Sequence, residues 1–214
     1  MIACRALVFD MDGLIVDSEP LWFRVERDFA RQRGGEFDAE LARTCVGRGM
    51  AHTLGVMRDA LGIRVDVDRD AAVIEDLFIG RVGELSLKPG FQDLFDDVRA
   101  RGIPRAVGSS SARRLVLAVL GRFGLREGFD AVVTGDCVPH PKPAPDIFLE
   151  AARRIGVEAP GCVVLEDSMS GVRAARAADM RVIAVPEGDR APFAGVADAV
   201  VDDLHQARAL LSFA

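Results

Sequence analysis

The sequence predicts an α/β protein in which a parallel sheet lies between two layers of helices, with an all-helical segment inserted after the first strand. Three features support this fold class. The apolar run 6–9 ends directly on Asp10-Met11-Asp12-Gly13, as expected for a strand that is buried on both faces. Residues 18–87 show helical spacing of apolar side chains and no strand pattern. From residue 88 onward, short apolar runs alternate with helical segments, which indicates a parallel sheet with helices on both faces.

The N-terminal part predicts one strand and then only helices. The strand is expected at residues 5–10. A helix is expected to start at Ser18-Glu19-Pro20, because proline is favoured in a first turn and apolar side chains recur at spacings of three and four from Leu21 to Ala30. The pair Gly34-Gly35 ends this helix. Further helices, separated by glycines, are expected at 37–46, 50–61 and 68–85.

The C-terminal part alternates between strands and helices. Strands are expected at 105–108, 131–134, 162–165, 181–185 and 199–201. Helices are expected at 91–101, 112–123, 145–155, 171–178 and 204–213. Residues 1–17 and 88–214 therefore form a Rossmann-like three-layer core, and residues 18–87 form a helical cap domain inserted into it. Hinges are expected near 16–17 and 87–88, because both linkers to the cap cross there.

Composition limits the partners of this chain. It has 214 residues, is 50% hydrophobic and carries a net charge of −6, so it can form a packed core but has no general attraction for nucleic acid or an anionic membrane. No stretch reaches the roughly 20 apolar residues of a membrane-spanning helix, and the N-terminus does not resemble a secretory signal. The four cysteines lack metal-binding spacing, so we expect reduced thiols and a cytoplasmic location. No exposed apolar stripe indicates an interface, so we expect a monomer.

Side chains capable of chemistry follow four of the predicted strands. Asp10 and Asp12 follow the first strand, and Ser109 ends another. Lys142, one of only two lysines among 27 basic residues, lies in a proline-rich loop, and Glu166-Asp167 end a further strand. Because the carboxyl ends of parallel strands share one edge of a sheet, we expect these residues to converge.

Each member of this set also has a plainer interpretation. The serines from Ser109 to Ser111 could cap the following helix, Lys142 could be a solvated surface residue, and Glu166-Asp167 could be incidental acids. The first acidic pair is not an EF-hand calcium loop, because its glycine stands at position four instead of six. Together the groups suit phosphoryl transfer, which needs a nucleophile, an acid/base, a cation and donors to the phosphate oxygens. Oxygen ligands of this kind favour Mg²⁺.

Four motifs, FDMDGLIVDSEP, VGSSS, PKPAPDIF and LEDSMSGVRAA, resemble in order and spacing those of the haloacid dehalogenase superfamily. The resemblance is to the β-phosphoglucomutase-like and 2-deoxyglucose-6-phosphatase-like branch, in which a helical cap follows the first motif. It implies that Asp10 is the nucleophile that forms an aspartyl-phosphate. It also implies that Asp12 is the acid/base that protonates the leaving alcohol and then activates water.

The same resemblance implies roles for the later motifs. Ser109 and Lys142 match the residues that grip the phosphate, and the Lys142-Pro143 peptide bond is expected to be cis. Mg²⁺ is held in this superfamily by the first aspartate, the backbone carbonyl of the second and the late acidic pair. This carry-over assigns metal binding to Asp10, Asp12, Glu166 and Asp167.

Departures from other members of the superfamily narrow the activity. Members that cleave phosphonates form a Schiff base on a cap lysine, and they are excluded because the segment 18–87 has no lysine. The dehalogenases lack a counterpart of Asp12, so the presence of Asp12 excludes them as well. β-Phosphoglucomutases remain an alternative, but they carry a cap lysine and a histidine where this chain has Trp22. The DSEPLW segment instead resembles bacterial sugar-phosphate phosphatases. We therefore expect a Mg²⁺-dependent phosphatase acting on a small phosphorylated metabolite, in particular a sugar phosphate.

Three cap residues are candidate substrate contacts. Trp22 either stacks on a sugar ring or packs within the core of its helix. Arg48 either binds an anionic or polar part of the substrate or is solvated in a glycine turn, and Glu19 is a candidate partner for substrate hydroxyls. His140 and His205 are expected to be surface or loop residues. A non-enzymatic alternative is a sensor that binds a phosphometabolite without turnover, although a binder has no need of an acid/base such as Asp12.

Overall fold

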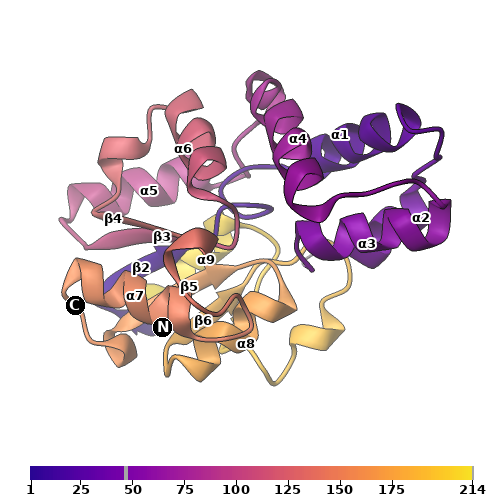
Figure 1. Ribbon diagram of the computed structural model, residues 1–214. Coiled ribbons are helices and arrows are strands. Elements are labelled where there is room, and N and C mark those ends of the chain that lie inside the picture. Colours follow the sequence, from indigo (N-terminus) through magenta and orange to yellow (C-terminus); the bar gives the residue numbers. More distant parts are fainter. Residues whose placement is uncertain (46–47, 214) are drawn as a thin grey trace. The chain divides into compact units, whose positions relative to one another are not determined.

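The computed structural model describes residues 1–45 and 48–213, and its contacts divide the chain into two compact units (Figure 1). We call Met1–Asp17 together with Ser86–Ala214 the sheet unit, and Ser18–Leu85 the helical unit. The sheet unit is thus interrupted in sequence by the helical unit. The contacts end the helical unit at Leu85, whereas the sequence places the end of the cap at residue 87.

The sheet unit is built on six parallel strands in the order β4-β3-β2-β5-β6-β7. In the central strand β2, Val8 lies opposite Ala106 of β3 on one side and Val164 of β5 on the other. All residues of β2 are buried, which explains its continuous apolar run. The strands are β2 (Ala6–Phe9), β3 (Arg105–Ser109), β4 (Ala131–Thr134), β5 (Cys162–Glu166), β6 (Arg181–Ala184) and β7 (Ala199–Val200).

Helices pack on both faces of this sheet, so the predicted Rossmann-like class is confirmed. On one face, Val8 belongs to an apolar cluster with Phe148 of α7 and Val172 of α8. Side chains alternate along a strand, and on the other face Phe9 contacts Phe91 of α5 edge to face, with the ring centroids 5.8 Å apart. The helices of this unit are α5 (Phe91–Ala100), α6 (Arg113–Arg122), α7 (Asp146–Ile155), α8 (Met169–Ala177) and α9 (Leu204–Leu210).

Both ends of the chain differ from the prediction. The strand predicted at 5–10 is β2 alone, and a separate strand, β1 (Ile2–Cys4), precedes it. The helix predicted at 204–213 ends at Leu210, because Leu211–Phe213 form strand β8, which pairs in parallel with β1. This pairing joins opposite ends of the chain, so the local spacing of apolar residues cannot reveal it. The other predicted elements of the sheet unit agree with the observed bounds to within two residues.

The two linkers that lead to the helical unit are paired with each other by backbone contacts. Val16 and Leu87 form an antiparallel bridge. The Asp17 N–H donates to the Ser86 carbonyl at 3.0 Å, and the Lys88 N–H donates to the Ile15 carbonyl at 2.9 Å. The chain therefore leaves and re-enters the sheet unit at one place.

The helical unit contains α1 (Glu19–Arg31), α2 (Ala39–Cys45), α3 (Met50–Leu61), α4 (Val67–Ile79) and the 3-10 turn η1 (Val82–Glu84). The helix predicted at 37–46 begins later, because the Asp38 carboxylate accepts hydrogen bonds from the N–H groups of the first turn of α2. Its predicted end at Val46, and the following Gly47, lie outside the described residues. The helix predicted at 68–85 ends at Ile79, before Gly80, and resumes only as η1.

Two expectations about composition can be compared with the structure. Cys4, Cys45, Cys137 and Cys162 are all free thiols, as predicted, and only Cys137 is not buried. Across 1–45 and 48–213, no helix combines the length and the apolar character that crossing a membrane requires.

A buried aspartate ties α4 to the turn that follows α1 within the helical unit. The Asp70 side chain is fully buried, and its Oδ1 accepts from Arg33 at 3.0 Å and from Arg69 at 3.1 Å. Its Oδ2 accepts from the Asp66 N–H at 2.9 Å. Burial alone would raise the pKa of Asp70, but these hydrogen bonds and the two arginines lower it below its ordinary value. The charged form is therefore the one that stabilises the fold.

Asp70→Asn should lower the free energy of unfolding of the helical unit by about 3 kcal/mol, because it leaves Arg33 without its buried counter-charge. The difference in unfolding free energy between wild type and Asp70→Asn should have its full value above the unfolded pKa of aspartate. It should shrink as the pH falls through the lower pKa that Asp70 has in the folded state. The sole tryptophan, Trp22, stacks on Phe78 within this unit with the centroids 4.1 Å apart, so urea unfolding can be followed by its fluorescence. The matched control is Asp59→Asn, since Asp59 pairs with Arg58 but is largely exposed; equal losses in both variants would contradict the prediction.

Candidate active site

Strand β2 ends in a tight turn that carries two carboxylates. The N–H of Asp10 donates to the Leu165 carbonyl of β5 at 3.0 Å, so its backbone still belongs to the sheet, and its carboxyl group is buried. The turn closes where the Gly13 N–H donates to the Val16 carbonyl at 3.0 Å. Gly13 has a φ of +74°, and a Cβ at this position would overlap the Asp167 carboxylate. Glycine is therefore required both for the turn and for the approach of Asp167.

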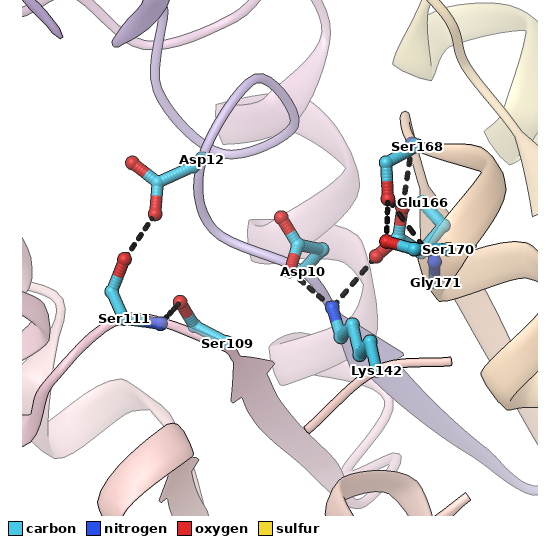
Figure 2. A network of polar contacts seen from close by, with 9 residues as sticks. All are labelled: Asp10, Asp12, Ser109, Ser111, Lys142, Glu166, Ser168, Ser170 and Gly171. Carbon is cyan, nitrogen blue, oxygen red and sulfur yellow. Dashed lines mark hydrogen bonds and ion pairs between the residues drawn. The ribbon is translucent and has the colours of Figure 1, made fainter. Parts of the chain in front are cut away.

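The Lys142 ammonium joins the ends of β2 and β5 (Figure 2). Its Nζ donates to Asp10 Oδ1 at 2.5 Å and to Glu166 Oε1 at 2.6 Å. The exposed fraction of the Lys142 side chain is only 4%, which rules out the solvated-surface interpretation. The Nζ also lies 4.8 Å from the centroid of the Phe148 ring, and the Lys142-Pro143 peptide bond is cis, as expected.

Burial and like charges shape the protonation of this group of residues. Burial raises the pKa of Asp10, Lys142 acts in the opposite direction, and Glu166 adds to the increase. Burial would lower the pKa of Lys142, but the Asp10 and Glu166 carboxylates outweigh it and raise that pKa above its ordinary value. Lys142 is therefore a cation at neutral pH, while the site has more acids than this single lysine can balance.

Glu166 is fixed by the first turn of α8. Its Oε2 accepts from the Ser168 N–H at 2.6 Å and from the Ser168 hydroxyl at 2.9 Å, while its Oε1 faces Lys142. Ser168 also caps α8, because its Oγ accepts from the Gly171 N–H at 3.1 Å. A Cβ at Gly171 would overlap the Glu166 carboxyl group. Hydrogen bonds to both oxygens therefore hold the buried carboxylate in place.

Three carboxylates at this edge form a candidate metal centre. Asp10, Glu166 and Asp167 each offer an oxygen, and these oxygens lie within 4.8 Å of one another. Two of the three residues are buried and the third is half-buried. Hard oxygen ligands and an excess of negative charge over Lys142 suit a divalent cation such as Mg²⁺. The residues present therefore fit the metal that the sequence predicts.

The second carboxylate of the turn, Asp12, lies beside the end of β3. Its Oδ2 accepts from the Ser111 hydroxyl at 2.8 Å, and the Ser111 N–H donates to Ser109 Oγ at 3.1 Å (Figure 2). Ser109 is buried and Asp12 is half-buried. Hydrogen bonds through Ser111 thus connect the predicted acid/base, Asp12, to Ser109 at the end of β3.

Six predicted residues therefore belong to the sheet unit and lie at one edge of its sheet: Asp10, Asp12, Ser109, Lys142, Glu166 and Asp167. Two further residues of this network, Ser111 and Ser168, were not predicted as functional. The available signals were the run of three serines after β3 and the serine at the N-cap of α8. His140 is exposed and lies 2.8 Å from Asp146, and His205 is also exposed, so both agree with the predicted surface positions.

Comparison with protein families identifies the architecture that carries this site. Residues 4–179 match the model of the haloacid dehalogenase-like hydrolases. The chain belongs to this family. The match includes the ends of β2, β3 and β5 and the lysine loop, so every residue of the candidate site lies within it. The resemblance stated from the four motifs is therefore confirmed.

Individual relatives agree with this assignment. The chain is 32% identical over 198 residues to hexitol phosphatase B of Escherichia coli, covering 85% of this chain and 83% of the relative. It superposes on CbbY from Rhodobacter sphaeroides in complex with phosphate with a TM-score of 0.86 at 29% identity, covering 94% and 95% of the two chains. A putative β-phosphoglucomutase from Thermotoga maritima gives 0.79 at 30% identity, covering 99% and 100%. At the level of enzyme class, the predicted phosphatase of this superfamily is confirmed.

In this haloacid dehalogenase-like hydrolase, the predicted cap contacts belong to the helical unit. Trp22 is half-buried and stacks on Phe78 with an interplanar angle of 29°, so one ring face has a partner inside its own unit. Arg48 is exposed, and its guanidinium lies 3.3 Å from the His52 ring. Glu19 is half-buried in the first turn of α1. A role of these three residues in substrate binding stays a prediction.

Proposed function

We propose that this hydrolase is a Mg²⁺-dependent phosphatase of small sugar phosphates that works through an aspartyl-phosphate on Asp10. The observation that carries the proposal is the contact of Lys142 with both Asp10 and Glu166 in a buried cluster, with Asp12 two residues from Asp10. A carboxylate held at 2.5 Å from an ammonium is oriented as a nucleophile, and the same ammonium can attract a phosphate oxygen.

The residues divide the work in two steps. In the first, an Asp10 oxygen attacks phosphorus, the bond to the sugar oxygen breaks, and Asp12 gives that oxygen its proton. In the second, water attacks the aspartyl-phosphate, Asp12 takes the proton of the water, and inorganic phosphate leaves Asp10. Ser109 and Lys142 donate to the phosphate oxygens in both steps.

Asp10, Glu166 and Asp167 would hold Mg²⁺ through their side chains, with the backbone carbonyl of Asp12 as a fourth ligand. When bound, the ion supplies positive charge that reduces the repulsion between the carboxylates and the phosphate. The oxygen cluster at this edge supports this part of the proposal.

The helical unit is proposed to act as a cap that chooses the substrate and excludes water during the reaction. The paired linkers at Val16 and Leu87 are the proposed hinges. Glu19, Trp22 and Arg48 are its candidate contacts to the sugar. The name of the hexitol phosphatase relative supports a phosphorylated sugar or sugar alcohol as substrate, and the protein is proposed to act as a cytoplasmic monomer.

Release of inorganic phosphate from a panel of sugar phosphates tests the proposal. The panel contains glucose 6-phosphate, 2-deoxyglucose 6-phosphate, sorbitol 6-phosphate and β-glucose 1-phosphate. With Mg²⁺ we expect steady release from at least one member, and with EDTA a fall of at least about 10²-fold that excess Mg²⁺ restores. Release that is unaffected by EDTA would overturn the metal dependence.

The likeness to a putative β-phosphoglucomutase favours one second candidate. A mutase would convert β-glucose 1-phosphate to glucose 6-phosphate when primed with glucose 1,6-bisphosphate, with little net release of phosphate. Trp22 stands where such mutases carry a histidine, so we expect hydrolysis to dominate. If neither release nor conversion occurs with any member of the panel, the phosphatase proposal fails and a binding role takes its place.

A further inference from the structure

The hydroxyl of Ser111 has a specific partner that helix capping does not explain. Ser111 lies just before α6, where serine side chains often cap a helix. Here the first N–H of α6, from Arg113, donates instead to the Asp136 carboxylate at 3.2 Å. The Ser111 hydroxyl donates to Asp12 Oδ2 at 2.8 Å, across 99 residues of sequence.

The backbone around Ser111 is held in place from two further directions. Its N–H donates to Ser109 Oγ at 3.1 Å, and its carbonyl accepts from the Gly135 N–H at 3.2 Å, at the end of β4. A Cβ on Gly135 would overlap the carbonyl of Ser110, so the backbone after β4 lies so close to the backbone after β3 that only glycine fits at position 135. The Ser111 side chain therefore projects toward Asp12 from a fixed backbone.

We propose that Ser111 is a positioning residue that orients two of the groups that act on the phosphate ester, Asp12 and Ser109. Its hydroxyl donates to one oxygen of Asp12 and thereby limits the rotation of that carboxyl group (Figure 2). Its amide occupies a lone pair of the Ser109 oxygen, which leaves the hydroxyl proton of Ser109 to donate to a phosphate oxygen. This inference rests on the proposed function and adds a residue to it.

The consequence depends on the leaving group. When Asp10 displaces a sugar alkoxide, the P–O bond breaks and Asp12 must deliver a proton to the departing oxygen. When the substrate is p-nitrophenyl phosphate, the same bond breaks but the nitrophenolate leaves without a proton. A misplaced Asp12 therefore slows cleavage of the sugar phosphate. It leaves the transfer of phosphate from p-nitrophenyl phosphate to Asp10 nearly unchanged.

The test compares kcat/KM of Ser111→Ala on p-nitrophenyl phosphate with that on the best sugar phosphate of the panel. This quantity reports the steps up to release of the alcohol, so slow hydrolysis of the aspartyl-phosphate does not enter. We expect a loss of about 10² on the sugar phosphate and less than about threefold on the aryl ester. Equal losses on both substrates, or no loss on either, would overturn the positioning role.

Ser111→Thr and Ser111→Val form a matched pair that differs in a hydroxyl and a methyl group. Thr should restore the ratio of the two kcat/KM values to within a few-fold of wild type, whereas Val should behave like Ala. If Ser111→Ala fails to give a cooperative thermal transition, the Ser111→Thr and Ser111→Val variants test the proposal through the same ratio of kcat/KM values. A wild type that hydrolyses neither substrate would contradict the proposed function itself, whereas an active wild type with an unchanged ratio in the variants would contradict only the role of Ser111.

Discussion

Asp10→Asn is expected to reduce phosphate release by at least about 10⁴-fold, because the amide cannot form the aspartyl-phosphate. The fold should survive, since asparagine has almost the same shape and removes one charge from an acidic cluster in which burial already raises the pKa of Asp10. Lys142 keeps its second partner, Glu166, in the variant. Phosphate release with Mg²⁺ and thermal unfolding by circular dichroism measure the two effects.

Two comparisons make the Asp10 result specific. Asp10→Ala should lose as much activity as Asp10→Asn, which shows that no property of the amide is responsible. Asp93→Asn removes an exposed carboxylate from the first turn of α5 and should leave the rate unchanged. If Asp10→Asn kept more than about one hundredth of wild-type turnover, the nucleophile assignment would be wrong.

Lys142→Met should have the second largest effect. It removes the cation that contacts both Asp10 and Glu166 and the proposed donor to the phosphate, so we expect kcat to fall by about 10² to 10³. The free energy of unfolding should fall by about 3 kcal/mol, because two buried carboxylates lose their common counter-charge. Steady-state kinetics and urea unfolding give both numbers.

Arg153→Met is the matched control for Lys142→Met. Arg153 also pairs with a glutamate, Glu150, but its side chain is 70% exposed, so neither turnover nor the unfolding midpoint should change measurably. A Lys142→Met enzyme whose kcat stayed within about threefold of wild type would exclude Lys142 as a phosphate contact.

The sequence could predict the fold and the principal members of the site because each carries a local signature. An apolar run that ends on two acids and a glycine predicts both the buried strand β2 and the turn that holds Asp10 and Asp12. Alternation of strands and helices predicts a parallel sheet, and a parallel sheet places the ends of β2, β3 and β5 at one edge. The scarcity of lysine in an otherwise arginine-rich chain indicates a specific role for Lys142.

Features that depend on distant pairing had no such signature. The β1–β8 pairing joins residues near the two ends of the chain, and each strand has only three residues, too few for a periodic pattern. The bond from Ser111 to Asp12 was missed for a related reason. A run of three serines after a strand indicates capping and phosphate binding equally. Only the structure shows that Asp136 accepts the first N–H of α6 and that the Ser111 hydroxyl donates to Asp12 instead.

The order of the sheet also determines when this enzyme can assemble during synthesis. Strand β2 is made before both of its neighbours in the sheet, β3 (Arg105–Ser109) and β5 (Cys162–Glu166). Ser18–Leu85 is made before either neighbour, and because this segment forms a compact unit of helices it can fold while β2 still has no partner. The buried strand β2 therefore has no partner in the sheet until β3 is made, and Asp10 gains its contact with Lys142 later still.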